Sequence, residues 1–130
     1  MNNYNFVKVG KWKLKDSLKS GVAFELFKFE EERVIYAFVA DNKTKYIGIC
    51  DNTNTTLKKR MSRYQGRQGS GTNERIANKI KDYLKQEKVV EILALKPEST
   101  LQYKGLNVDL VKGVENPLIE ELKPEWNIQK

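Results

Sequence analysis

Apolar residues gather into two short runs in the first half of the chain, and their spacing predicts a β-hairpin. Residues 34–40 read Val-Ile-Tyr-Ala-Phe-Val-Ala, a continuous run rich in β-branched and aromatic side chains that is typical of a strand buried on both faces. The turn formers Asp41 and Asn42 follow, and residues 46–50 supply a second apolar run. The two runs therefore predict paired strands joined by a short loop.

Helical spacing replaces strand spacing further along the chain. Leu57, Met61 and Tyr64 occupy the i, i+4 and i+7 positions of one helical face, which predicts a first helix. The glycine-rich segment 65–71 interrupts it, and Thr72 is a suitable N-cap for a second helix. The apolar stripe of that second helix consists of Ile76, Ala77, Ile80, Tyr83 and Leu84.

The C-terminal third of the chain predicts two more strands and one more helix. Residues 89–95 indicate a third strand, and residues 101–110 a fourth one centred on alternating apolar positions. A last helix is expected over residues 112–122, before Pro124. If it starts near Gly113, Pro117 lies in its first turn, where proline is tolerated.

This order of elements predicts an α/β fold of the α+β type. We expect a small mixed or antiparallel sheet that starts with the hairpin and is flanked by about three helices. A chain of 130 residues fits a single domain. Within residues 1–130, residues 1–32 are interpreted as an N-terminal appendage and residues 33–127 as the core.

Composition narrows the class of protein. The chain is 39% hydrophobic and 32% charged, which is ordinary for a globular domain. No apolar stretch approaches the roughly 20 residues of a membrane span, and no signal peptide is evident, so we expect a cytoplasmic protein without membrane contact. The chain has no histidine, which excludes histidine-based triads, histidine zinc sites and histidine-dependent nucleases. The single cysteine, Cys50, is interpreted as a small core or strand residue.

Positive charge is concentrated in the middle of the chain. The net charge is +7, and residues 53–88 hold ten basic residues against three acidic ones, whereas the remaining segments hold fourteen of each sign. Such an excess is expected where lysine and arginine neutralise phosphates. A solvated helical surface is the alternative that charge alone leaves open.

Four short motifs between residues 34 and 127 resemble those of the GIY-YIG nuclease family. Val34-Ile35-Tyr36 and Tyr46-Ile47-Gly48 resemble the two triplets that name the family. The helix from Leu57 to Tyr64 is similar to that of the bacterial excision-repair member, with Arg60 before an apolar residue and Tyr64 four positions on. The segment Glu115-Asn116-Pro117-Leu118-Ile119 resembles the family's motif around its metal-binding glutamate. The segment Pro124-Glu125-Trp126-Asn127 resembles its proline-aromatic-asparagine ending.

The chain departs from the family pattern at four places. Val34 replaces the first glycine, and Ile49 stands where many members have a lysine, so the resemblance implies no lysine-assisted base. Residues 51–56 make the approach to the arginine helix about four residues longer than in the repair enzyme. Segment 66–72 is similar to an insertion of restriction-type and other stand-alone members.

Two charged residues fall on or beside apolar helical faces, where each needs a partner. Arg60 borders the stripe of Leu57 and Tyr64, so it is satisfied either by a carboxylate or by a substrate phosphate. Glu115 falls among the apolar residues of the last helix, so it pairs with Arg60 or binds a cation. Both alternatives place Glu115 beside Arg60.

The resemblance implies a hydrolytic site for phosphodiesters of DNA. It assigns the general base to Tyr46 and a supporting role to Tyr36, because nearby positive charge lowers the pKa of a tyrosine below its usual value of about 10. Arg60 then neutralises the phosphoryl group, and Glu115 binds Mg²⁺, with Mn²⁺ as an alternative. Tyr64 and Asn127 contact phosphate or brace the site. Backbone phosphates are expected to be bound by Lys58, Lys59, Arg63, Arg67, Arg75 and Lys79.

The resemblance implies DNA as the partner and no small-molecule cofactor. No separate recognition domain is evident, so three alternatives remain for sequence specificity. Segment 66–72 recognises the DNA, a homodimer or another partner supplies the recognition, or the specificity is low. A catalytically silent nucleic-acid-binding module on the same fold is the main rival reading, and a core-only protein with a solvated basic face is the second.

The two tyrosines serve one water only if their side chains share a face of the hairpin. Side chains alternate across a strand, so Tyr46 must lie opposite an even-numbered residue such as Phe38 or Ala40. A three-residue loop over residues 42–44 pairs Ala40 with Tyr46. A four-residue loop pairs Val39 with Tyr46, so that a bulge is needed. The chemistry therefore requires the three-residue loop or a bulge.

Overall fold

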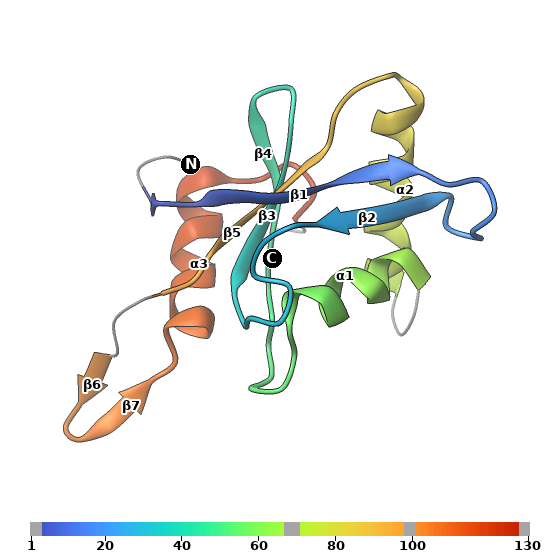
Figure 1. Cartoon of the computed structure of the whole chain (residues 1–130). Helices are drawn as coiled ribbons and strands as arrows, with labels where there is room; N and C mark the ends of the chain where they lie inside the picture. Colours follow the sequence, from blue (N-terminus) through green and yellow to red (C-terminus); the bar gives the residue numbers. More distant parts are fainter. Residues whose placement is uncertain (1–3, 67–70, 98–100, 128–130) are drawn as a thin grey trace.

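A five-stranded antiparallel sheet forms the centre of the protein (Figure 1). We describe it from a computed structural model, which describes residues 4–66, 71–97 and 101–127. The strand order is β2-β1-β5-β3-β4, so that β2 and β4 are the two edges. The strands of this sheet are β1 (Val7–Leu14), β2 (Val22–Leu26), β3 (Ile35–Ala40), β4 (Lys43–Ile49) and β5 (Glu91–Leu95).

Helices cover both faces of the sheet. The described helices are α1 (Leu57–Gly66), α2 (Gly71–Lys85) and α3 (Leu110–Leu122). The apolar faces of α1 and α2 pack in one core cluster with Tyr36 and Phe38 of β3. The apolar face of α3 packs in a second cluster with Ile35 and Ile47. Because neighbouring residues of β3 point to opposite faces, this strand contributes to both layers.

The fold class predicted from the sequence is confirmed. The structure is an α+β fold whose antiparallel sheet includes the expected β3–β4 hairpin, and three helices flank it within the described residues. The N-terminal segment supplies β1 and β2 to the same sheet, and β1 pairs with β5. None of the described helices is long and apolar enough to span a membrane.

The strand predicted over residues 101–110 is a separate small hairpin instead. Its strands are β6 (Leu101–Tyr103) and β7 (Leu106–Val108), and it extends away from the body of the protein (Figure 1). The chain reverses at Lys104 and Gly105, whose φ angles are 51° and 82°. Two consecutive residues with positive φ form a tight hairpin turn, and the apolar alternation had concealed it.

The last helix begins earlier than predicted, at Leu110 rather than near Gly113. Asp109 is its N-cap, and the Asp109 side chain accepts hydrogen bonds from the backbone N–H groups of Val111 and Lys112. Pro117 is therefore inside the helix, and its placement in the first turn is wrong. The helix continues past the missing N–H of Pro117 because a capped first turn precedes it and its apolar face packs on the sheet.

Candidate active site

A β-bulge brings Tyr36 and Tyr46 to the same face of the sheet. Tyr36 pairs with Gly48 and Phe38 pairs with Tyr46, but the next pair is Val39 with Thr44, so Lys45 is an extra residue in β4. The loop has two residues, Asp41 and Asn42, with φ angles of 53° and 60°. The predicted three-residue loop is therefore wrong, whereas the bulge alternative and the shared face are confirmed.

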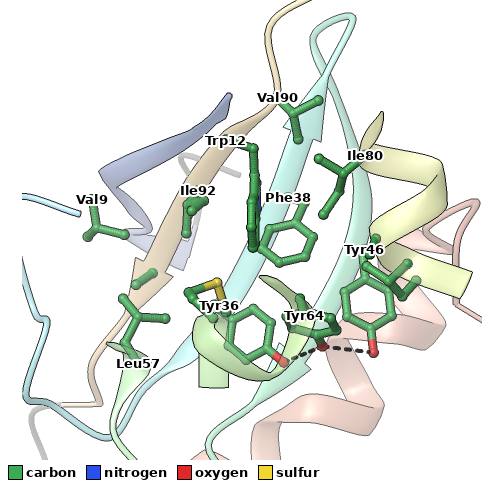
Figure 2. Packing of buried hydrophobic residues seen from close by; sticks show 14 of the residues in the cluster. Val9, Trp12, Tyr36, Phe38, Tyr46, Leu57, Tyr64, Ile80, Val90 and Ile92 are labelled. Atoms are coloured by element: carbon green, nitrogen blue, oxygen red, sulfur yellow. Dashed lines mark hydrogen bonds between the residues drawn. The ribbon is translucent and has the colours of Figure 1, made fainter. Parts of the chain in front are cut away.

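Three tyrosine hydroxyls meet at one end of the larger core cluster (Figure 2). The hydroxyls of Tyr36 and Tyr64 are 2.6 Å apart, and Tyr64 donates a hydrogen bond of 3.5 Å to the hydroxyl of Tyr46. Tyr36 and Tyr64 are fully buried, and Tyr46 is 8% exposed. Burial raises the pKa of Tyr36 and of Tyr64 above the usual tyrosine value. These two phenols therefore stay protonated, and Tyr46 is the hydroxyl closest to solvent.

Gly48 is required beneath the ring of Tyr36. A Cβ atom on residue 48 would lie 2.5 Å from both Cζ and Oη of Tyr36, far inside van der Waals contact. Glycine at the end of the second triplet thus lets the phenol of Tyr36 lie flat across β4 and reach Tyr64. In the sequence, Gly48 stands out only as the last residue of the triplet that resembles the family motif.

Arg60 lies beside the tyrosine cluster at the edge of the core. Its guanidinium is 4.6 Å from the ring centroid of Tyr64, and its Nη1 donates to the side-chain oxygen of Asn73 at 3.2 Å. Burial lowers the pKa of Arg60, but the surrounding tyrosine oxygens outweigh it, so the net pKa is above the usual value. Within the described residues Arg60 forms no ion pair. A permanent positive charge with one neutral amide partner suits the capture of an anionic group.

Glu115 approaches Arg60 from the other side of the sheet. It lies half-buried on α3, and burial, followed by the charge of Asp51, raises the pKa of Glu115, whereas Arg60 lowers it. No hydrogen bond or ion pair satisfies this carboxylate within the described part of the chain. Arg60 and Glu115 thus come from helices that pack on opposite faces of the sheet, and they are close enough for the charge of Arg60 to act on Glu115.

A single carboxylate is enough for a hydrated magnesium ion. Mg²⁺ keeps several waters and is commonly held by one or two carboxylates together with substrate phosphates. No group of three or more cysteine, aspartate or glutamate side chains that could hold a metal occurs among the described residues. The half-buried carboxylate of Glu115, near Asp51, fits the water-rich type of site and does not fit an all-protein cage.

The C-terminal segment fastens the edge of β4. The side chain of Asn127 accepts from the backbone N–H of Ile47 at 3.0 Å and donates to its carbonyl at 2.9 Å. The N–H of Trp126 donates to the carbonyl of Lys45 at 2.7 Å. Asn127 therefore pairs with Ile47, between Tyr46 and Gly48, as a residue of a neighbouring strand would.

Basic residues of the predicted phosphate-binding set lie in different surroundings. Lys58 and Lys59 are exposed on α1, Arg63 is partly buried there, and Lys79 is exposed on α2. Arg75 donates to the backbone carbonyl of Trp126 at 2.8 Å, which ties α2 to the C-terminal segment. Arg67 lies outside the described residues.

Three residues that the structure links to the site or to the helices carrying it carry no recognisable signal in the sequence. Asn73 became visible only as the partner of Arg60, and Lys45 only as the bulge residue that binds Glu125 at 2.8 Å. Arg33 pairs with Asp109 across 76 positions of the chain. An aspartate just before a helix is a recognisable N-cap type, but no local pattern indicates such distant partners.

The sheet and its covering helices have a GIY-YIG-like fold. The structure of a glutamate-to-alanine mutant of bacteriophage T4 EndoII, a GIY-YIG nuclease, is similar over 98% of this chain and 95% of that chain, with a TM-score of 0.74 and 22% sequence identity. The restriction endonuclease HPY188I, solved in complex with product DNA, is similar over 92% of this chain and 74% of that chain, with a TM-score of 0.56 and 23% identity. No protein-family model and no curated protein sequence matches the chain.

Proposed function

We propose that the protein is a metal-dependent endonuclease that hydrolyses phosphodiester bonds of DNA. The observation that carries this proposal is the grouping of three tyrosine hydroxyls with Arg60, which forms no ion pair within the described residues, and with the half-buried Glu115, which lies within reach of the charge of Arg60. The similar solved structures support it, because both belong to endonucleases and one of them contains product DNA. We assign the chemistry to the core over residues 33–127.

Tyr46 is the general base in this proposal. It is the acceptor at the end of the chain of hydroxyls from Tyr36 through Tyr64, and it is the least buried of the three. A water in line with the scissile phosphorus–oxygen bond gives its proton to the ionised Tyr46 oxygen as it attacks. Tyr36 and Tyr64, which stay protonated, orient the Tyr46 oxygen through their hydrogen bonds.

Arg60 stabilises the charge that develops on the phosphoryl group. Its guanidinium is oriented by Asn73 and by the ring of Tyr64, so little reorganisation is needed when the phosphate arrives. Glu115 would hold one Mg²⁺, with Mn²⁺ as an alternative, and the bound ion would neutralise the leaving oxygen. The exposed Lys58 and Lys59 and the partly buried Arg63 bind neighbouring backbone phosphates without reading the sequence.

Cleavage of supercoiled plasmid DNA, with Mg²⁺, with Mn²⁺ and with chelator, tests the proposal. We expect nicked and linear products only when the metal is present. Arg60→Ala and Glu115→Ala should each abolish cleavage, because each removes a charge that the chemistry needs. Lys13→Ala is a matched control, since it also removes a charge but lies on β1, away from the edge strand β4.

DNA-binding measurements beside the cleavage assay separate the rival functions. A catalytically silent binding module would retain DNA in chelator and leave it intact after Mg²⁺ is added. A protein with a merely solvated basic face would show no steep salt dependence of DNA binding. Normal cleavage by both Arg60→Ala and Glu115→Ala would refute the mechanism even if the wild-type protein cuts DNA.

A further inference from the structure

Arg33 joins three segments that are far apart in the sequence. Its guanidinium donates two hydrogen bonds of 2.8 Å to the two carboxylate oxygens of Asp109. The same side chain donates from Nη2 to the carbonyl of Asp51 at 3.1 Å and from Nε to the carbonyl of Asn52 at 3.0 Å. The side chain of Arg33 is 20% exposed. We call this arrangement of Arg33, Asp51, Asn52 and Asp109 the arginine clamp.

The segments held by the clamp lead directly to the two charged residues of the proposed site. Asp51 and Asn52 begin the loop that enters α1, where Arg60 lies one turn from the start of the helix. Asp109 is the N-cap of α3, where Glu115 lies six residues further on. The helices α1 and α3 pack on opposite faces of the sheet. The distance between Arg60 and Glu115 therefore depends on how the two layers are joined.

We propose that Arg33 is a positioning residue, whose clamp on Asp109 and on the loop before α1 sets the separation of Glu115 from Arg60. This inference rests on the proposed nuclease function. Arg33 itself touches neither the tyrosine cluster nor Glu115 in any described contact, so it acts through the backbone of the segments that it holds.

Electrostatics agree with a fixed ion pair at this position. The hydrogen bonds to Asp109 raise the pKa of Arg33, and those from Arg33 lower the pKa of Asp109. Two parallel N–H to oxygen bonds also fix orientation, which a single contact of a lysine would not do. Two further donors of Arg33 bind backbone carbonyls, so the clamp defines a position rather than only a charge balance.

Two conservative variants separate the clamp from the other roles of its members. Asp109→Asn keeps a side chain that caps helices well, so that α3 still begins at the same place, but it removes the bidentate ion pair. Arg33→Lys keeps the positive charge and loses the two-pronged geometry. Glu25→Gln is the matched control, because it weakens the ion pair of Lys13 with Glu25 at the opposite side of the sheet.

Single-turnover cleavage and DNA binding in chelator give the first readout. We expect the cleavage rate of Arg33→Lys and of Asp109→Asn to fall about 10- to 100-fold, since a misplacement of about 1 Å costs rate of this order. The DNA affinity in chelator should change less than about 2-fold, because the basic residues of α1 that are proposed to bind backbone phosphates are untouched. Glu25→Gln should cleave like the wild-type protein.

Distance measurement between α1 and α3 gives a readout that does not need cleavage. Spin labels at Ser62→Cys and Glu120→Cys lie on exposed positions of the two helices. The native Cys50 is fully buried, and burial raises the pKa of its thiol, so the label reacts with the introduced cysteines. We expect Arg33→Lys and Asp109→Asn to broaden the distribution of label distances, and Glu25→Gln to leave it unchanged.

The outcomes distinguish the two proposals. Distance distributions identical to that of the wild-type protein in both variants would overturn the positioning role, as would a broadened distribution with an unchanged cleavage rate. A wild-type protein that does not cut DNA would refute the proposed function, and the distance distribution alone would then decide whether the clamp sets the separation of α1 and α3.

Discussion

A single added methyl group at Gly48 should disrupt the tyrosine cluster. In Gly48→Ala the new Cβ would lie 2.5 Å from Cζ and Oη of Tyr36 and 2.8 Å from its Cε1. Favourable contacts between carbon atoms lie at about 3.5–4.0 Å, so either β4 or the ring must move by about 1 Å. A displacement of this size breaks the hydrogen bond of 2.6 Å between Tyr36 and Tyr64.

The cost follows from how firmly Tyr36 is held. Its ring is fully buried, and the centroids of Phe38 and Tyr64 lie 5.6 and 6.2 Å from its own, so no alternative rotamer is open. Overpacking of this kind costs about 1–3 kcal/mol. For a domain of this length, that corresponds to a fall in the melting temperature of about 4–12 °C.

Thermal unfolding and single-turnover cleavage together test this prediction, with Gly113→Ala as the matched control. A Cβ at Gly113 would meet only Cγ1 of Val108, at 4.0 Å, and alanine stabilises a helix interior by roughly 0.5–1 kcal/mol relative to glycine. We therefore expect Gly113→Ala to melt slightly higher and to cleave normally. A Gly48→Ala protein that melts and cleaves like the wild-type protein would refute the close packing of Tyr36 against residue 48.

Four further predictions concern chemistry, bracing, binding and pH. Tyr46→Phe should slow single-turnover cleavage by about 100-fold or more with an unchanged melting temperature, and a near-normal rate would exclude Tyr46 as the base. Asn127→Ala loses two hydrogen bonds to Ile47 and should lower the free energy of unfolding by about 2 kcal/mol in a denaturant titration; no change would mean that Asn127 does not brace β4. The double variant Lys58→Ala with Arg63→Ala should reduce the slope of log affinity against log salt by about 2, measured by fluorescence anisotropy, and an unaltered slope would remove both residues from the DNA interface. Arg33 lowers the pKa of Asp109 from 3.8, so the ionised Asp109 stabilises the folded protein above about pH 4. This contribution is lost as the pH falls through the lowered pKa. In Asp109→Asn the free energy of unfolding should therefore fall less steeply with decreasing pH.

Local patterns predicted those parts of the fold that local physics decides. The apolar run over residues 34–40 became β3, and the spacing of Leu57, Met61 and Tyr64 gave the buried face of α1, because both patterns record burial within one element. The pairing of Arg33 with Asp109 and of Arg60 with Asn73 left no such trace. Each of these contacts depends on where two separate elements meet, which no period along the chain encodes.

The bulge at Lys45 shows why the register of the hairpin needed the whole fold. With the two-residue turn at Asp41 and Asn42, a regular ladder would pair Tyr36 with Ile47 and Ala37 with Tyr46, and Tyr46 would point to the α3 face. Apolar patterning cannot reject that arrangement, because β3 and β4 are buried on both faces.

Close packing and contacts with the C-terminal segment disfavour this regular ladder. Without the bulge, the branched side chain of Ile47 would stand opposite Tyr36, where the ring now lies across Gly48 with no space for even a Cβ. With the bulge, the extra residue Lys45 binds Glu125 through its side chain and Trp126 through its carbonyl. These contacts offset the loss of regular strand pairing at Lys45, and they come from residues about 80 positions further along the chain. The tyrosine that the proposed chemistry needs therefore points into the site because a glycine and a distant C-terminal segment together select an irregular strand.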